Sequence, residues 1–147
     1  MLGARTYQAQ LVTPAGVKFE GQVDYLRLPG VDGYFGVMAD HAPLIAALVP
    51  GRIVVTPEQG RQVVYAGGGG VVEVKDNKLV ALVDTLETPE EIDLARAREA
   101  AERARALLAG KRGAELDPAR AEAALARALV RLKVASEHGR VNEKREE

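Results

Sequence analysis

The chain contains no cysteine and no tryptophan, and histidine occurs only twice, as His41 and His138. A protein without cysteine forms neither disulfides nor thiolate metal sites. Two histidines are too few for a metal centre built from several imidazoles, so we expect no metal site. The chain also lacks any run approaching the roughly 18–20 apolar residues of a membrane helix, which predicts no direct membrane insertion.

The chain also has no large excess of positive or negative charge. The 147 residues carry a formal net charge of −1, and basic and acidic residues are nearly balanced on both sides of Thr88. This balance excludes the one-signed field of a general nucleic-acid binder, so we expect no nucleic-acid partner. The first residues run into a strand pattern without a signal or transit segment. We therefore expect a soluble protein that works where it is made and reaches any membrane through a protein partner.

The residues that are present change in kind at Thr88-Pro89. Twelve of the 15 glycines and all aromatic residues precede this point, whereas 15 alanines fall within the 59 residues that follow it. Aromatic residues among β-branched runs are typical of a sheet domain, and an alanine-rich segment favours helices. The composition predicts a β domain at 1–87, a helical hairpin at 88–138 and a disordered tail at 139–147.

Short alternating segments mark the strands of the first part. Alternation places one kind of side chain on each face of a strand. Between these segments, Glu58-Gln59-Gly60 and Asp76-Asn77 predict hairpin turns, because glycine and asparagine tolerate a positive φ. Many short strands without intervening helices predict an antiparallel sandwich or flattened barrel. The predicted strands are 7–13, 23–28, 52–56, 62–66, 71–75 and 78–83.

Four consecutive glycines, Gly67–Gly70, allow two interpretations. A glycine-rich loop can bind phosphate, but this one lacks the Lys-Ser/Thr of a P-loop and precedes a strand instead of a helix. We favour a close backbone approach or a bulge between neighbouring strands.

Capping signals define both helices of the second part. Thr88 is the predicted N-cap, with Pro89 in the first helical position and Glu91 completing a capping box. That helix should end near Leu108, and Asp117-Pro118 should start the second helix, whose apolar residues follow a 3-4 spacing. Most of these apolar positions are alanine, whose burial contributes little. We therefore expect a weakly packed antiparallel hairpin that can exchange one docking surface for another.

No combination of residues indicates catalysis. His41 follows Asp40 in a turn-rich region from Leu28 to Leu44, but no nucleophile or second base is placed beside them by the sequence. We therefore expect no catalytic residues. The favoured interpretation is that His41 buttresses the turn or contacts a partner protein.

The hairpin carries arginines at helical spacings. Asp93, Arg96 and Arg103 lie close to one face of the first helix, and Arg127 and Arg131 are one turn apart on the second. Ordinary surface salt bridges, each worth about 0.3–0.5 kcal/mol, would explain them. A pocket for a polyanion would explain them too, since no carboxylate separates the two arginines of the second helix. The spacing leaves both interpretations open.

Two motifs of the first part resemble one known family. Pro29-Gly30-x-x-Gly33-x-x-Gly36, followed by His41-Ala42-Pro43-Leu44, is similar to the signature of the epsilon subunit of F-type ATP synthase. The segments Ala66-Gly67-Gly68 and Leu82-Val83-Asp84 fit that family as well, and so does the order of β domain and hairpin. The resemblance covers roughly residues 6–137.

The resemblance implies a ten-stranded antiparallel β-sandwich followed by a C-terminal αα-hairpin, in a non-catalytic subunit of the central rotor stalk. The implied partners are the gamma subunit, the membrane c-subunit ring and, when the hairpin extends, the alpha/beta catalytic head. In this family the hairpin can block ATP hydrolysis, and in some bacterial members ATP binds the folded hairpin. No cofactor is required, and ATP would be a regulatory ligand. The expected location is the cytoplasmic face of the cell membrane, peripheral through the complex.

The resemblance also implies site residues. Ile92-Asp93-x-x-Arg96-Ala97 matches the family's nucleotide-binding box. The implied ATP-binding set is Glu87, Asp93, Arg96, Arg103, Arg127 and Arg131. The implied partner-binding set is Gly30, Gly33, Tyr34 and His41. Tyr34 stands where many relatives have glutamate or another polar residue, so its contact with the c ring is expected to differ.

A second class of function remains open. A stand-alone β-sandwich binding module with a dimerising helical tail would have the same two-part pattern. Co-purification with a large membrane ATPase separates the two classes.

Overall fold

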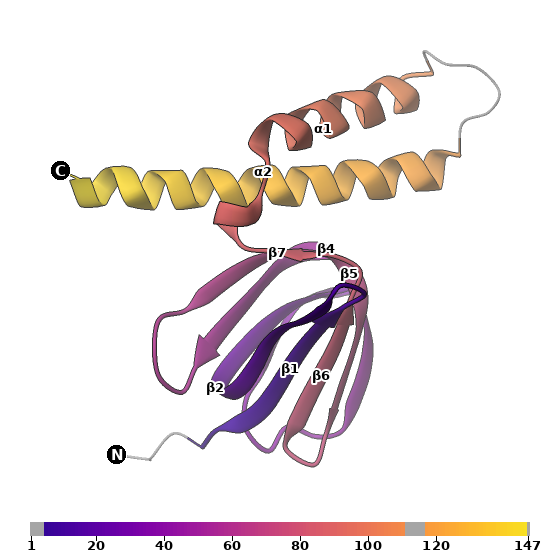
Figure 1. Ribbon diagram of the computed structural model, residues 1–147. Coiled ribbons are helices and arrows are strands. Elements are labelled where there is room, and N and C mark those ends of the chain that lie inside the picture. Colours follow the sequence, from indigo (N-terminus) through magenta and orange to yellow (C-terminus); the bar gives the residue numbers. More distant parts are fainter. Residues whose placement is uncertain (1–4, 111–116, 147) are drawn as a thin grey trace. The chain divides into compact units, whose positions relative to one another are not determined.

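The computed structural model describes residues 5–110 and 117–146 of the chain, with side chains described as far as His138 (Figure 1). The chain divides into two compact units, Met1–Leu86 and Glu87–Glu147. This boundary falls one residue before the predicted one, which lay between residues 87 and 88.

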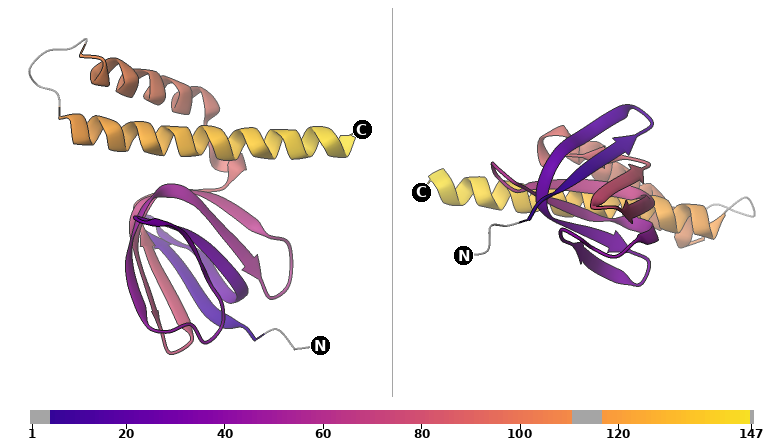
Figure 2. Two further views of the ribbon diagram at one scale, coloured as in Figure 1. Left: turned by 180° about the vertical axis from the view of Figure 1, so that it is seen from behind. Right: turned by 90° about the horizontal axis from the view of Figure 1, so that it is seen from below.

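The first unit is a single sheet that closes on itself. Its strands follow the order β1-β6-β5-β4-β2-β3, and β7 pairs with β5. Because β1 also pairs with β2, the sheet forms a flattened barrel, seen from two further sides in Figure 2. Within the described residues the strands are β1 (Tyr7–Thr13), β2 (Gly16–Gly30), β3 (Gly33–Val37), β4 (Leu44–Pro57), β5 (Val63–Lys75), β6 (Lys78–Val83) and β7 (Leu86–Glu87).

The expected count of ten strands is wrong for the described residues, which form seven. The difference lies in β2, β4 and β5, which are 15, 14 and 13 residues long. The register of β2 against β4 shifts twice, between Val23 and Tyr25 and between Arg27 and Gly30. Such irregularities bend a strand without ending it, so one long strand can serve both layers of the sandwich. The expectation of a purely antiparallel sheet also needs correction, because β1 and β6 pair in parallel.

The core of this unit is built from alternate residues of the strands. The burial pattern of β1 changes at every residue, with Ala9 and Leu11 fully buried. Leu26 and Val55 are buried where β2 and β4 pair, and burying a side chain of this size stabilises a fold by about 1.5–3 kcal/mol. Tyr7 is also buried, and its hydroxyl donates a hydrogen bond to the carbonyl oxygen of Val37 at 2.7 Å. Burial raises the pKa of this phenol far above its usual range.

Two predicted backbone features of the sheet are confirmed. Asp76 and Asn77, with φ of 51° and 58°, form the turn between β5 and β6. The glycine run lies inside β5, and a Cβ on Gly70 would overlap the carbonyl oxygen of Leu82. Close approach of the backbones therefore explains this glycine, as the strand context predicted.

The second unit begins with a short turn and continues as two helices. The turn η1 spans Pro89–Glu91, α1 spans Leu94–Leu108 and α2 spans Pro118–Glu146. The backbone N–H and the hydroxyl of Thr88 both donate to Oε1 of Glu91, at 3.1 and 3.0 Å. Thr88 therefore caps only η1, and the expectation that it starts the long helix is wrong. Helix α1 has its own N-cap, Asp93, whose Oδ1 accepts a hydrogen bond from the backbone N–H of Arg96 at 3.1 Å.

The ends of the helices follow their predicted signals with one difference. Gly110, with φ of 75°, follows the end of α1, and Oδ1 of Asp117 accepts a hydrogen bond from the backbone N–H of Arg120 at 3.4 Å. The rest of the predicted connecting loop, residues 111–116, lies outside the described residues. Helix α2 continues through Glu146, where the sequence indicated a tail from residue 139. The Lys, Arg and Glu residues of this segment have good helix propensity, which favours continuation of the helix.

Small residues line the contact between the two helices. Helices α1 and α2 run antiparallel and pack side by side (Figures 1 and 2). The buried residues of α1 are Ala97, Ala101 and Ala104, and those described on α2 are Ala121, Ala128 and one larger residue, Val134. Alanine removes little apolar area from water, so this hairpin gains little packing energy per residue. Neither helix of the described chain is long and apolar enough to cross a membrane.

Candidate functional site

The structure joins two of the predicted nucleotide-binding residues directly. Nε of Arg131 donates a hydrogen bond to Oε1 of Glu87 at 2.6 Å, and each side chain is 27% exposed. These residues are 44 positions apart in the sequence, and they meet because α2 packs against the segment that precedes α1. A charge-assisted hydrogen bond of this length, partly shielded from water, is stronger than an ordinary surface ion pair.

A second ion pair links the same two segments. Nε2 of His138 lies 3.0 Å from Oε1 of Glu90, and the two groups form an ion pair when the imidazole is protonated. His138 and Arg131 are about two helical turns apart and therefore share one face of α2. Sequence reasoning missed both His138 and Glu90. The available signal was the seven-residue spacing on α2 together with two carboxylates three residues apart before α1.

The remaining members of the predicted nucleotide-binding set belong to the two helices. The carboxylate of Asp93 is engaged as the N-cap of α1, so one of its oxygens already accepts a backbone hydrogen bond. Arg96 and Arg103 are exposed on α1, and Arg127 is half-buried on α2. None of these three arginines forms an ion pair within the described residues. Three guanidinium groups without a carboxylate partner are the chemistry required to bind a polyphosphate.

In the first unit, Gly30 and Gly33 form the turn between β2 and β3. They pair with each other across the strands, and Gly33 has φ of 128°, a value that favours glycine. A Cβ on Gly30 would lie 2.9 Å from the carbonyl oxygen of Gly33. Both glycines are therefore required by the tightness of this turn, whatever the turn contacts.

Tyr34 follows this turn and is 49% exposed. Its hydroxyl accepts a hydrogen bond from the backbone N–H of Arg52 at 3.0 Å, and the guanidinium carbon of Arg27 lies 4.7 Å from the ring centroid. A cation stacked on an aromatic face is attracted by about 0.5–1 kcal/mol at an exposed site. This position therefore presents an aromatic ring beside a cation, where an acidic residue would present a carboxylate.

His41 lies in the loop 38–43, between β3 and β4. The ring is half-buried, and its Nδ1 is 2.7 Å from the carbonyl oxygen of Ala42, which assigns the proton to Nδ1. The side chain is thus turned back onto its own loop, in agreement with the buttressing role. In the described part of the chain, no three His, Asp or Glu side chains converge on a site for a metal ion.

The structure reveals an exposed apolar face that sequence reasoning missed. The strand register aligns Ala47, Val71, Leu82, Val12 and Val17 across β4, β5, β6, β1 and β2. In this row Leu82 is 53% exposed and Val17 is 52% exposed. Ile45, two residues before Ala47 on the same face of β4, is 74% exposed. Apolar residues fill both faces of β4, so alternation could not tell which face is covered.

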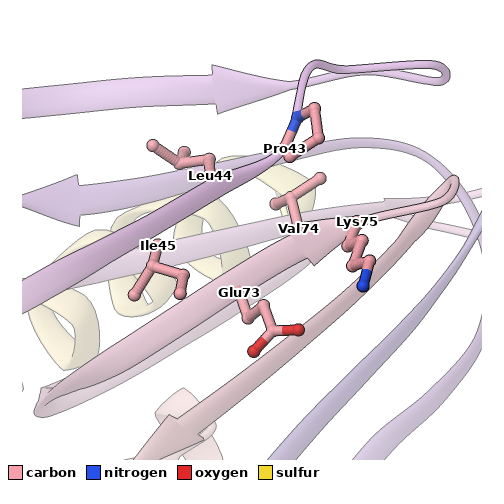
Figure 3. A pocket seen from close by; sticks show the side chains of 6 residues that line it. All are labelled: Pro43, Leu44, Ile45, Glu73, Val74 and Lys75. Atoms are coloured by element: carbon pink, nitrogen blue, oxygen red, sulfur yellow. The ribbon is translucent and has the colours of Figure 1, made fainter.

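One end of this apolar face is hollowed. The hollow is open to solvent and has a volume of about 440 Å³. Figure 3 shows Ile45 beside Glu73 there, so an apolar surface meets charged groups at its margin. The residues that line the hollow are Pro43, Leu44, Ile45, Glu73, Val74 and Lys75.

Comparison with known proteins assigns both units to domains of one family. Residues 6–89 match the beta-sandwich domain of the ATP synthase delta/epsilon chain. Residues 90–136 match the long alpha-helix domain of the same chain. The boundary between the two matches lies within three residues of the boundary between the two structural units.

Several bacterial proteins are similar over nearly the whole chain. The ATP synthase epsilon chain of Desulforamulus reducens is 41% identical over 132 residues, which cover 90% of this chain and 98% of the relative. The ATP synthase epsilon chain of Moorella thermoacetica is 40% identical over 126 residues, which cover 86% and 93%.

Solved structures share the fold at low sequence identity. A chain of the Euglena gracilis mitochondrial ATP synthase (OSCP/F1/c-ring) aligns with a TM-score of 0.73 at 24% identity, covering 85% of this chain and 78% of that one. A chain from the central stalk/c-ring of the Tetrahymena thermophila mitochondrial ATP synthase aligns with a TM-score of 0.54 at 14% identity, covering 89% and 94%. The motifs, the two-domain match and the bacterial relatives agree, and this chain belongs to the ATP synthase delta/epsilon chain family.

Proposed function

We propose that this chain is a non-catalytic subunit of the central rotor stalk of a proton-translocating F-type ATP synthase. In this role it binds the gamma subunit and the c-subunit ring and couples the catalytic head to the membrane ring. It lies at the cytoplasmic face of the cell membrane, peripheral through the complex. Family membership supports this role, and so do the relatives, which are epsilon chains of ATP synthase.

The observation that carries the proposal is the exposed apolar face of the first unit. Monomeric proteins seldom leave contiguous large apolar side chains in water, and such a patch marks a binding surface for a protein. Ile45 and Leu82 are 74% and 53% exposed on this face. The loop 38–43, which contains the predicted partner-binding residue His41, precedes Leu44 and Ile45, so this loop and the apolar face are neighbours along the chain.

The hairpin is the regulatory part of this proposal. When extended it contacts the alpha/beta catalytic head and inhibits ATP hydrolysis, and ATP binding favours the folded hairpin. Three features support this role: the alanine-rich contact between the helices, the Glu87–Arg131 pair, and the arginines 96, 103 and 127, which form no ion pair with the residues whose side chains are described. A weakly packed element changes its docking surface at a low free-energy cost.

The decisive experiment measures binding to a catalytic head with gamma subunit from which this subunit has been removed. The wild-type chain should bind with submicromolar affinity. Ile45→Asp places a charge in the apolar face and should raise Kd by roughly 100-fold, because the buried carboxylate has no partner. Gln59→Asp adds the same charge on an exposed turn between β4 and β5 and should leave Kd unchanged.

An opposite result would point to the stand-alone binding module. If the wild-type chain did not bind the stripped head and sedimented as a dimer that dissociates when residues 88–147 are removed, the dimerising tail would be the better explanation.

A further inference from the structure

Three segments distant in the sequence are connected through one side chain, that of Asn77. Its Oδ1 accepts a hydrogen bond from the backbone N–H of Asp40 at 2.7 Å, and its Nδ2 donates to the carbonyl oxygen of Thr6 at 3.0 Å. Its own carbonyl oxygen accepts from the backbone N–H of Gln8 at 3.4 Å. The β5–β6 turn is therefore tied both to the start of β1 and to the loop 38–43.

The loop that Asn77 holds contains a strained backbone position. Asp40 has φ of 61°, a left-handed conformation that costs a residue with a Cβ free energy and persists only when neighbouring contacts impose it. The Asp40 carboxylate also pairs with Nη1 of Arg5 at 2.7 Å. Those two side chains are 56% and 82% exposed, so water and salt weaken that pair. The hydrogen bond from the Asp40 backbone to Asn77 also lies at the surface, and it fixes the strained backbone of Asp40 itself, whereas the Arg5 pair engages only the side chain.

We propose that Asn77 is a positioning residue for the partner-binding surface, acting through the loop 38–43. This inference rests on the proposed function, because the surface that Asn77 holds in place is the one proposed to bind the rotor. Met38 at one end of the loop is 64% exposed, and Ile45 just beyond its other end is 74% exposed. The loop that Asp40 belongs to therefore carries or adjoins two of the most exposed apolar side chains of the first unit.

The chemistry of asparagine explains why this residue occupies the position. Asn77 has φ of 58°, which asparagine and glycine adopt more readily than most residues. Its carboxamide offers an acceptor and a donor together, and the two bonds to Asp40 and Thr6 use one of each. Aspartate would lack the donor for the Thr6 carbonyl, and glycine would keep the turn but form neither bond.

The chain offers a matched pair of variants for the test. Asn77→Gly keeps the turn and removes both side-chain hydrogen bonds. Asp76→Gly alters the adjacent turn position, which has φ of 51°, and the Asp76 side chain makes no hydrogen bond within the described residues. Amide hydrogen exchange should accelerate at Asp40 by at least 10-fold in Asn77→Gly and by less than twofold in Asp76→Gly. Equal exchange in both variants would overturn the proposal.

Binding to the stripped head with gamma subunit tests the functional part. Asn77→Gly should raise Kd about fivefold to 10-fold, mainly through faster dissociation, whereas Asp76→Gly should not. In a His41→Ala background, Asn77→Gly should raise Kd by a smaller factor than in the wild type, because both changes act on the loop 38–43. If the two changes instead raised Kd additively in free energy, Asn77 would contact the partner directly, and the proposal would be overturned. Normal binding by Asn77→Gly would refute only the role of Asn77. Failure of the wild-type chain to bind would refute the proposed function and this role with it.

Discussion

Glu87 and Arg131 place a carboxylate and a guanidinium at 2.6 Å where the sequence places both in one nucleotide-binding set. The pair satisfies Arg131 when no other anion is near, and it holds the segment before α1 against α2. A phosphate group that approaches Arg131 must therefore either share the guanidinium with Glu87 or displace the carboxylate. If ATP binds as proposed, its affinity and the stability of the folded hairpin should depend on the same contact.

Replacing Glu87 by glutamine should loosen this attachment. The amide keeps the shape but loses the charge-assisted hydrogen bond, which is worth roughly 1 kcal/mol for partly exposed groups. We expect amide exchange near Arg131 on α2 to accelerate by about fivefold. Glu99→Gln, on the exposed side of α1, is the control and should leave this exchange unchanged. Equal protection in the two variants would show that the pair contributes nothing to hairpin stability.

Two arginines of the hairpin, Arg103 and Arg127, permit a direct test of ATP binding. Calorimetric titration of the wild-type chain should detect ATP at or below millimolar concentration. Arg103→Ala and Arg127→Ala should each weaken binding by about 10-fold or more, because each removes a charge-assisted hydrogen bond to phosphate. Arg98→Ala, also exposed on α1, should bind ATP as the wild type does. Absence of ATP binding, or binding unaffected in both test variants, would leave these arginines as surface charges.

One glycine of the signature motif should prove structural. A Cβ on Gly36 would lie 2.6 Å from Cε2 of Tyr25, within the space that the ring occupies. Gly36→Ala should therefore lower the free energy of unfolding of the first unit by about 2 kcal/mol or more. Gly21→Ala is a matched control, since its Cβ would meet only the far end of the Phe19 ring at 3.9 Å. Urea unfolding measures both variants, and similar midpoints would contradict the expected overlap.

At the scale of elements, local patterns predicted most of the fold. The alternation of 7–13 and 78–83 matches β1 and β6, and the Asp76-Asn77 turn lies where its residues indicated. Thr88 and Asp93 are both residues that favour a helix N-cap. The sequence predicted Thr88 as the N-cap of the long helix, whereas Asp93 is the N-cap of α1 in the structure. Which of the two residues begins the helix depends on the path of the chain after β7, and capping preferences alone do not predict that path.

Features that depend on distant residues could not be read from the sequence. The parallel pairing of β1 with β6 and the merging of short strands into long bent ones are set by how the barrel closes. The ion pair of His138 with Glu90 requires the register of α2 against η1, which helical periodicity leaves free. The exposure of Ile45 and Leu82 could not be predicted, because the sequence does not tell which face of the sheet is covered.

At the scale of the whole molecule, the two units should be separable. All residues of the hydrophobic core cluster of the first unit lie between Tyr7 and Leu86. A fragment of residues 1–87 should therefore melt cooperatively by circular dichroism. It should also bind the stripped head but no longer inhibit ATP hydrolysis. An unfolded fragment would refute the two-part architecture, and a folded fragment that still inhibits would refute the role of the hairpin.

The closure of the sheet has a mechanical consequence for the proposed place of this chain in a rotor. β1 has neighbours on both sides, β2 antiparallel and β6 parallel, so it cannot be peeled away from an open edge. A tangential force on one end of the barrel strains the hydrogen bonds of several strands at once instead of breaking them one after another. Such a body transmits torque with little internal deformation, and elastic compliance would then reside in the connections to its partners.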